Sequence, residues 1–182
     1  MLSQDLKLRE VATVRIIPPQ FLGSQGFVEF AVEVANVGSG HKLPSGMPGQ
    51  RQLWLDITVR DAEGRAVFTS GKLDENGFID SSAIKFQAVL VDADGNPTHH
   101  FWRGTKILSD NRILPEGEVR VHYSFMLPET AREPISIQAV LNYSVFAQEM
   151  VNELLGDDAP KVPVLRMAED WVRVPLEPSE GR

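Results

Sequence analysis

One histidine lies at the centre of a glycine- and proline-rich segment and is the residue best placed to do chemistry. Residues 37–51 read VGSGHKLPSGMPGQR, with four glycines, two prolines and His41. Glycine permits close approach of the backbone, whereas proline fixes φ and stiffens the chain. A loop of this length inside a compact domain is more often functional than decorative. It presents either an imidazole for a metal or an imidazole that hydrogen-bonds loop carbonyls and orders the turn.

The other histidines are weaker metal-ligand candidates. His99 and His100 are adjacent, and neighbouring residues of a strand face opposite sides, so they cannot readily bind one metal ion together. Either can join His41 in a small copper or zinc site, because imidazole suits both metals. His122 alternates onto the polar face of its strand and is expected at the surface.

The remaining sequence contains no recognised catalytic arrangement. It lacks a Gly-x-Ser-x-Gly elbow, a phosphate-binding glycine loop and a His-Glu-x-x-His motif, so we expect no enzymatic activity. Asp92, Asp94 and Asn96 supply oxygen atoms that suit calcium, but the terminal glutamate of a calcium loop is absent. We therefore predict a hairpin turn at residues 92–97.

Composition excludes several classes of function. The 182 residues include no cysteine, which excludes disulfides, Cys-ligated zinc and covalent attachment of haem c. The net charge of −7 argues against a nucleic-acid partner, whose phosphates need a basic surface. No segment approaches the about 18 apolar residues of a membrane span, and residues 1–15 contain no apolar signal-peptide core.

Alternation of apolar and polar residues dominates the chain and is typical of strands with one buried face. In residues 27–34, for example, Val28, Phe30, Val32 and Val34 share one face. Similar patterns predict strands over residues 52–60, 118–126 and 134–143, and weaker ones over 10–17, 65–70, 84–91, 102–108 and 170–174. Glycine-containing turns at 61–64, 92–97 and 114–117 separate these segments.

Residues 146–155 have the periodicity of a helix that packs on the strands or docks a partner. The cap candidates are Ser144 and Gly156, and the apolar face contains Phe146, Met150, Val151, Leu154 and Leu155. About nine strands and one short helix predict an all-β fold, an antiparallel immunoglobulin-like β-sandwich. Residues 1–176 are expected to form this single domain and residues 177–182 a flexible tail.

Several motifs taken together resemble a known module. They are residues 40–46 (GHKLPSG), 51–55 (RQLWL), 61–64 (DAEG), 68–71 (FTSG), 100–102 (HFW) and 111–116 (NRILPE). They resemble the cysteine-free β-sandwich that follows the haem-binding part of bacterial extracytoplasmic multihaem c-type cytochromes, whose loop typically reads Gly-His-x-x-Pro-Thr-Gly. Ser45 stands in place of the threonine and keeps its hydroxyl. Because no Cys-x-x-Cys-His motif is present, any haem must belong to a partner domain or chain.

The resemblance implies a non-catalytic accessory or docking domain of a multihaem electron-transfer system, located in the periplasm or outside the cell. In this interpretation His41 supplies an axial imidazole to a partner's haem iron. Arg51 is suited to bind a haem propionate. Trp54, on the strand face opposite the core, is expected to form one side of the loop. The full set of expected loop and docking residues is Gly40, Pro44, Ser45, Gly46, Arg51 and Trp54.

Two other classes of function stay open. One is a free-standing β-sandwich binding module for carbohydrate or protein, in which Trp54, Trp102 or Trp171 contacts the ligand. The other is a small metal-binding enzyme centred on His41. Motifs of a cytochrome in the adjoining coding sequence would favour the docking domain over both.

Overall fold

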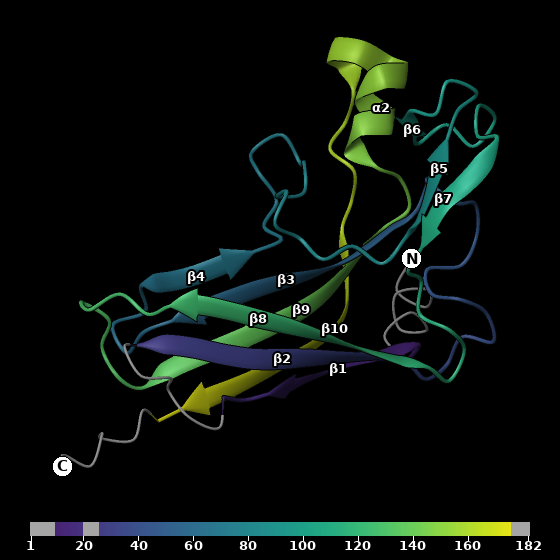
Figure 1. Ribbon diagram of the computed structural model, residues 1–182. Helices are drawn as coiled ribbons and strands as arrows, with labels where there is room; N and C mark the ends of the chain where they lie inside the picture. The colour runs from purple at the N-terminus through teal and green to yellow at the C-terminus, as the bar shows by residue number, and fades with distance from the viewer. Residues whose placement is uncertain (1–9, 20–25, 176–182) are drawn as a thin grey trace.

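Two antiparallel sheets pack face to face in the computed structural model, which describes residues 10–19 and 26–175 (Figure 1). One sheet has the strand order β1-β2-β8 and the other β10-β9-β3-β4. The strands are β1 (Ala12–Ile17), β2 (Phe27–Asn36), β3 (Gln52–Arg60), β4 (Ala66–Ser70), β8 (Glu118–Met126), β9 (Ile135–Ser144) and β10 (Leu165–Val174). The prediction of an all-β antiparallel sandwich is confirmed.

A third, smaller sheet lies beyond one end of the sandwich, next to the helix (Figure 1). Its strand order is β6-β5-β7, formed by β5 (Ala88–Val91), β6 (Pro97–Thr98) and β7 (Lys106–Asp110). The α-helix α2 (Gln148–Leu155) is followed by the short 3₁₀ helix η1 (Gly156–Asp158). We call this sheet, the segment that follows it and the two helices the end region (residues 88–113 and 148–158).

The core is formed by the inward faces of the two large sheets. In β2, Val28, Val32 and Val34 are fully buried, and in β9 the same is true of Ile137 and Leu141. Full burial of one such side chain stabilises a fold by about 1.5–3 kcal/mol. Because the side chains of a strand alternate between faces, the alternating sequence pattern fixes which face of each strand enters the core.

The two sheets come together along the edge formed by β1 and β10. The backbone N–H of Ile16 in β1 donates to Oδ2 of Asp170 in β10, with an N···O distance of 2.7 Å. An edge strand has backbone donors without a strand partner, and this carboxylate satisfies one of them. The contact links the two sheets across their edge.

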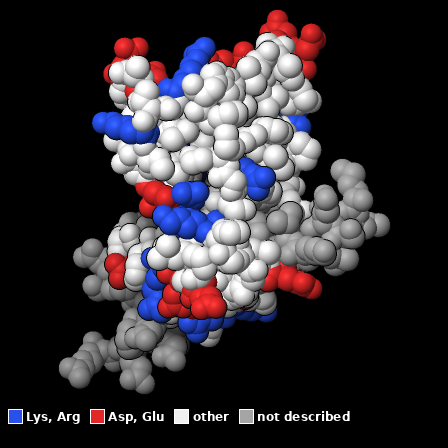
Figure 2. Space-filling view, turned by 90° about the vertical axis from the view of Figure 1, so that its right-hand side faces the viewer, with Lys and Arg blue, Asp and Glu red and all other residues white. Residues whose placement is uncertain are grey.

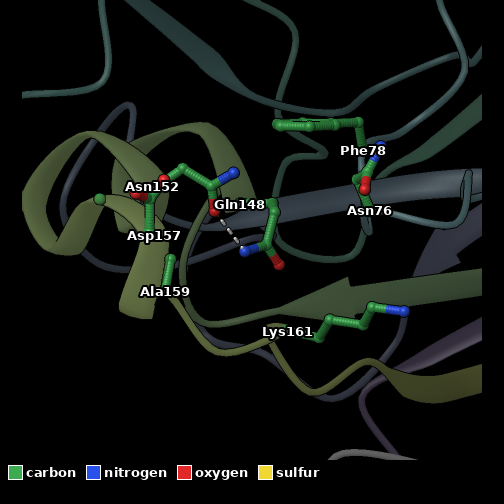
Figure 3. Close-up of a pocket in the computed structure, with 8 residues that line it drawn as sticks. Asn76, Phe78, Gln148, Asn152, Asp157, Ala159 and Lys161 are labelled. Atoms are coloured by element: carbon green, nitrogen blue, oxygen red, sulfur yellow. Dashed lines mark hydrogen bonds between the residues drawn. The ribbon is translucent and has the colours of Figure 1, made fainter.

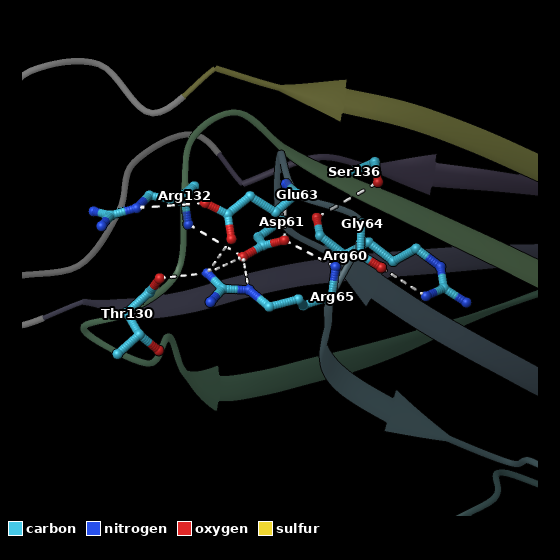
Figure 4. A network of polar contacts seen from close by, with 8 residues as sticks. All are labelled: Arg60, Asp61, Glu63, Gly64, Arg65, Thr130, Arg132 and Ser136. Carbon is cyan, nitrogen blue, oxygen red and sulfur yellow. Dashed lines mark hydrogen bonds and ion pairs between the residues drawn. The ribbon is translucent and has the colours of Figure 1, made fainter.

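A buried carboxylate holds the other end of the sandwich together (Figure 4). Asp61 follows β3 and accepts hydrogen bonds from the guanidinium of Arg65 at 2.6 and 2.8 Å and from the backbone N–H groups of Glu63, Arg65 and Arg132. Arg65 also donates to the carbonyl of Thr130. Burial acts to raise the pKa of Asp61, but these hydrogen bonds keep it below its usual value. The carboxylate thus ties the β3–β4 hairpin to the β8–β9 connection.

The weaker strand predictions needed correction. Within residues 10–19 and 26–175, ten strands form instead of about nine, and the two-residue β6 was not expected. The strand predicted over 102–108 begins only at Lys106, so Trp102 lies in a turn. The strand predicted over 84–91 begins at Ala88. The turn at 92–97 forms as predicted, since Asp92 Oδ1 accepts hydrogen bonds from the N–H groups of Asp94 and Asn96.

The helix is shorter than its apolar pattern predicted. Its N-cap is Ala147, whereas Ser144 donates to the carbonyl of Phe146 at 2.9 Å. Gly156 ends the helix with a φ of 62°, as expected. Leu154 and Leu155 are each 54% exposed, so the end of the apolar face does not pack on the sandwich.

The predicted tail, residues 177–182, lies outside the described residues. In the described part of the chain, no helix has the length and apolar character needed to cross a membrane.

Candidate functional site

The loop of residues 37–51 is held against the end region at two points. Leu43 exchanges backbone hydrogen bonds with Ile113, with N···O distances of 2.8 and 2.9 Å. Farther along, Nδ1 of His99 lies 3.0 Å from the carbonyl oxygen of Gly49. Gly49 has a φ of +78°, and a Cβ there would lie 3.2 Å from the carbonyl oxygen of Thr98. Both conformation and space therefore favour glycine where the loop meets β6.

Asn36, the last residue of β2, orders the turn that carries His41. Its side chain is buried, with 1% of the residue exposed. Nδ2 donates to the carbonyls of His41 at 2.9 Å and Ile113 at 3.3 Å, and Oδ1 accepts from the N–H of Ser39 at 3.1 Å. Asn36 belongs to no recognised motif, and the available signal was an asparagine at the entrance to a glycine-rich turn.

The imidazole of His41 is exposed and makes no hydrogen bond to any residue that the structure describes. The backbone of His41 is held instead: its N–H donates to Ser39 Oγ at 3.3 Å and its carbonyl accepts from Asn36. The sequence left open whether the imidazole of His41 orders the turn or binds a metal. In the structure, Asn36 and the main chain order the turn. Both ring nitrogens of His41 are available to an external group.

An ion cluster fixes the residue that follows His41. Asp110, at the end of β7, accepts hydrogen bonds from Lys42 Nζ at 2.9 Å and from Arg112 Nε and Nη2 at 2.9 and 2.7 Å. These contacts, chiefly with Arg112, hold the pKa of Asp110 well below its usual range although burial opposes them. The carboxylate is therefore charged at neutral pH and clamps the loop onto β7.

Apolar side chains are exposed on the end region next to this loop. Every residue of β7 is exposed, including Ile107 and Leu108, and the turn before β7 exposes Phe101 and Trp102. We call these four residues the apolar end surface. Figure 2 views the molecule from the side on which β7 lies, and the middle of its upper half is largely free of charged side chains. Exposed apolar groups gathered in this way are typical of an interaction surface.

The other predicted loop residues differ in accessibility. Gly40 and Gly46 are exposed, Ser45 is partly buried and Pro44 is buried. Gly46 has a φ of +97°, and a Cβ there would lie 2.8 Å from Nε of Arg51. The guanidinium of Arg51 thus packs over Gly46, close to the outer surface of the loop.

Trp54 does not have the predicted role. It lies on the face of β3 opposite the core, as expected, but it is only 1% exposed. Its Nε1–H donates to the carbonyl of Gly71 at 3.0 Å, beneath the segment that follows β4. The sequence could not show this, because the covering segment is distant from Trp54 along the chain. Trp54 is a packing residue and offers no surface for docking.

His99 and His100 are engaged within the chain. His99 contacts Gly49, as described above, while Nε2 of the buried His100 lies 2.8 Å from Oε2 of Glu153 in α2. The ring of His100 also packs on Trp102, with 4.6 Å between ring centroids. Within residues 10–19 and 26–175, no three His, Asp or Glu side chains gather in a way that suits a metal ion.

A cleft of about 270 Å³ lies between α2 and the turn that contains Asn76 and Phe78 (Figure 3). Gln148 lines it, but its amide makes three hydrogen bonds inside the protein. Nε2 donates to Asn152 Oδ1 at 2.7 Å and to the carbonyl of Pro160 at 3.0 Å, and Oε1 accepts from the N–H of Val162 at 2.7 Å. Gln148 therefore holds the chain that returns from the helix to β10 and is not free to bind a ligand.

No protein-family model matches this chain, and no curated protein matches it. Among solved structures, a penta-heme cytochrome c552 from Thermochromatium tepidum has a TM-score of 0.69 at 19% sequence identity over 93% of this chain. The chain spans 41% of the length of that cytochrome chain.

Two other solved structures are much less similar. They are a CARDB domain from Pyrococcus furiosus, 16% identical over 91% of this chain and 94% of that chain, and a putative ApaA protein from Bordetella pertussis, 12% identical over 90% and 94%. Their TM-scores are both 0.36. The fold of this chain is therefore related to that of part of a multihaem cytochrome.

Proposed function

We propose that this chain is a haem-free accessory domain of a multihaem c-type cytochrome system and that it docks against the haem-bearing part. The observation that carries the proposal is the fold shared with a penta-heme cytochrome over 93% of the chain. Since the chain contains no cysteine, it holds no haem through thioether bonds. Its haem-bearing partner is a domain or chain with Cys-x-x-Cys-His motifs. We place the system outside the cytoplasm, because the loop motif of this chain resembles that of extracytoplasmic cytochromes.

His41 is proposed to supply the axial ligand to one haem iron of that partner. Low-spin electron-transfer haems need a second strong axial ligand, and a neutral imidazole provides one. His41 is exposed, its ring makes no hydrogen bond within the described residues, and its backbone is held by Asn36 and Ser39. A ligand on a braced loop loses little conformational entropy when it binds.

The apolar end surface is proposed to contact the partner beside that haem. The exposed edge of a haem is largely apolar, and covering it restricts solvent and shifts its reduction potential. Ile107, Leu108 and Trp102 supply such a cover. Arg51, which packs over Gly46 and beside the Tyr143 hydroxyl, is proposed to bind a propionate.

The ligand role of His41 is tested with microperoxidase, a haem c peptide that has one axial histidine and an open sixth position. The chain is titrated into it, and the Soret band is followed. We expect conversion to a low-spin spectrum, and we expect His41→Ala to lose most of it. His122→Ala is the matched control, because His122 is also exposed but lies on β8. Equal conversion by wild type and His41→Ala would refute ligation by His41.

The docking role is tested with the haem-bearing neighbour. We expect Cys-x-x-Cys-His motifs in the same or an adjoining reading frame, and co-production of that part should give a complex. In this complex His41→Ala should turn one low-spin electron paramagnetic resonance signal into a high-spin signal. A haem protein that fails to bind the chain would overturn docking, whereas an unaltered low-spin signal in a stable complex would overturn only ligation.

A further inference from the structure

A second surface, which shares no lining residue with the His41 loop, has the chemistry of a ligand site. A groove of about 270 Å³ crosses the outer face of the sheet β10-β9-β3-β4. Its polar lining comes from four segments: Asp56 in β3, Lys72 after β4, Gln138 and Asn142 in β9, and Arg166 in β10.

Two side-chain amides, those of Asn142 and Gln138, line this groove. Asn142 is only 7% exposed, yet neither its amide nor that of Gln138 makes a side-chain hydrogen bond with any residue in the described ranges. Gln148, an equally buried amide elsewhere, makes three. The amides of Asn142 and Gln138 line the groove, with Val140 between them on the same face of β9. Because each amide offers both a donor and an acceptor, the lining suits a ligand that has both.

The charges of the groove do not select a simple anion. Lys72 Nζ lies 2.7 Å from Asp56 Oδ1, so its charge is already compensated. Arg166 Nη1 lies 3.9 Å from Oε2 of Glu169. The groove therefore offers a ligand mainly the hydrogen-bonding amides of Gln138 and Asn142, and not an excess of positive charge.

An exposed tryptophan continues the groove along the sheet. Trp171 in β10 is the cross-strand partner of Gln138 in β9, which places both side chains next to each other on the same outer face. Trp171 is 58% exposed. An indole ring beside hydrogen-bonding side chains offers a flat apolar platform with polar groups at its edge.

We propose that this groove binds a saccharide. A sugar ring presents hydroxyl groups, which donate and accept, around its edge, and an apolar C–H face. Gln138, Asn142 and Asp56 suit the hydroxyls, and Trp171 suits the C–H face. The proposal is independent of the haem docking role, since none of its residues lies in the loop of His41 or on the apolar end surface.

The test is a titration of the ¹⁵N-labelled chain with xylo-, cello-, chito- and galacturonic acid oligosaccharides, followed by nuclear magnetic resonance. We expect at least one of them to shift the side-chain amide resonances of Gln138 and Asn142 in a saturable way. Trp171→Ala should weaken binding by about tenfold, because it removes the stacking platform. Trp102→Ala is the matched control, as Trp102 is similarly exposed but lies on the end region.

A second variant protects the test against misfolding. Gln138→Ala changes a partly exposed side chain with no internal hydrogen bond, so the fold should persist and saccharide affinity should fall. The proposal is overturned if none of the oligosaccharides shifts the two amides. It is equally overturned if Trp102→Ala weakens binding while Trp171→Ala and Gln138→Ala do not.

Discussion

The sandwich and the end region use the same residue types in opposite ways. In the sandwich, aliphatic side chains such as Ile137 and Leu141 point inward and are fully buried. In β7, the neighbouring residues Ile107 and Leu108 are both exposed. A two-layer sandwich covers the inner face of each sheet, but within the described part of the chain no second sheet covers β7, whose residues are all exposed.

The polar residues of the two regions differ as well. Asp61 at the end of β3 is surrounded by donors that hold the sandwich itself together. Asp110 at the end of β7 binds Lys42 and so positions a loop whose histidine ring makes no hydrogen bond to any described residue. The comparison indicates that the sandwich supplies stability, whereas the end region leaves apolar side chains exposed.

The largest expected difference between the two regions concerns aliphatic side chains. Ile137→Ala should lower the free energy of unfolding by about 2–5 kcal/mol, because it leaves a cavity in a fully packed core. Leu108→Ala, at a residue that is 60% exposed, should change it by less than about 0.5 kcal/mol. Urea denaturation measures both. Similar losses for the two variants would contradict the division into a stabilising core and a presenting surface.

A smaller effect is expected from the carboxylate that closes the sandwich. The pKa of Asp61 is lowered in the folded protein, so its contribution is fully present above the unfolded pKa of about 3.9 and is lost as the pH falls through the folded pKa. Asp61→Asn should lower stability at neutral pH and flatten its decline in acid. Denaturation series between neutral and acidic pH measure this, with Asp94→Asn as control because the exposed Asp94 carboxylate accepts no hydrogen bond within the described chain. An unchanged acid slope in Asp61→Asn would contradict the assignment.

The smallest effect is expected at His41, and Asn36 provides the contrast within the same loop. Asn36→Ala removes three hydrogen bonds of a buried amide and should cost about 1–3 kcal/mol. His41→Ala removes a side chain without an internal partner and should change stability by less than about 0.5 kcal/mol. Thermal or urea unfolding of both variants tests the pair. A marked loss of stability in His41→Ala would mean that its imidazole orders the turn after all.

The sequence by itself determined the sandwich. Alternation over β2, β3, β8 and β9 defined both the strands and their buried faces, because a strand's two-residue period couples residue type directly to face. The turn at Asp92 and the glycine that ends the helix were also readable, since these positions need particular backbone angles or local hydrogen bonds. The loop of His41 stood out for the same local reason, its glycines and prolines.

Only the tertiary structure decided which of these residues are accessible. Trp54 and Trp171 both lie on the outer face of the four-stranded sheet, yet Trp54 is covered by the segment after β4 while Trp171 is open to solvent. Asn36 and Asp110 became part of the site through contacts with residues far along the chain, at Ile113 and Lys42. Local sequence patterns carry periodicity and backbone preference, but burial and hydrogen-bond satisfaction depend on segments brought together from distant positions, which no single stretch of sequence contains.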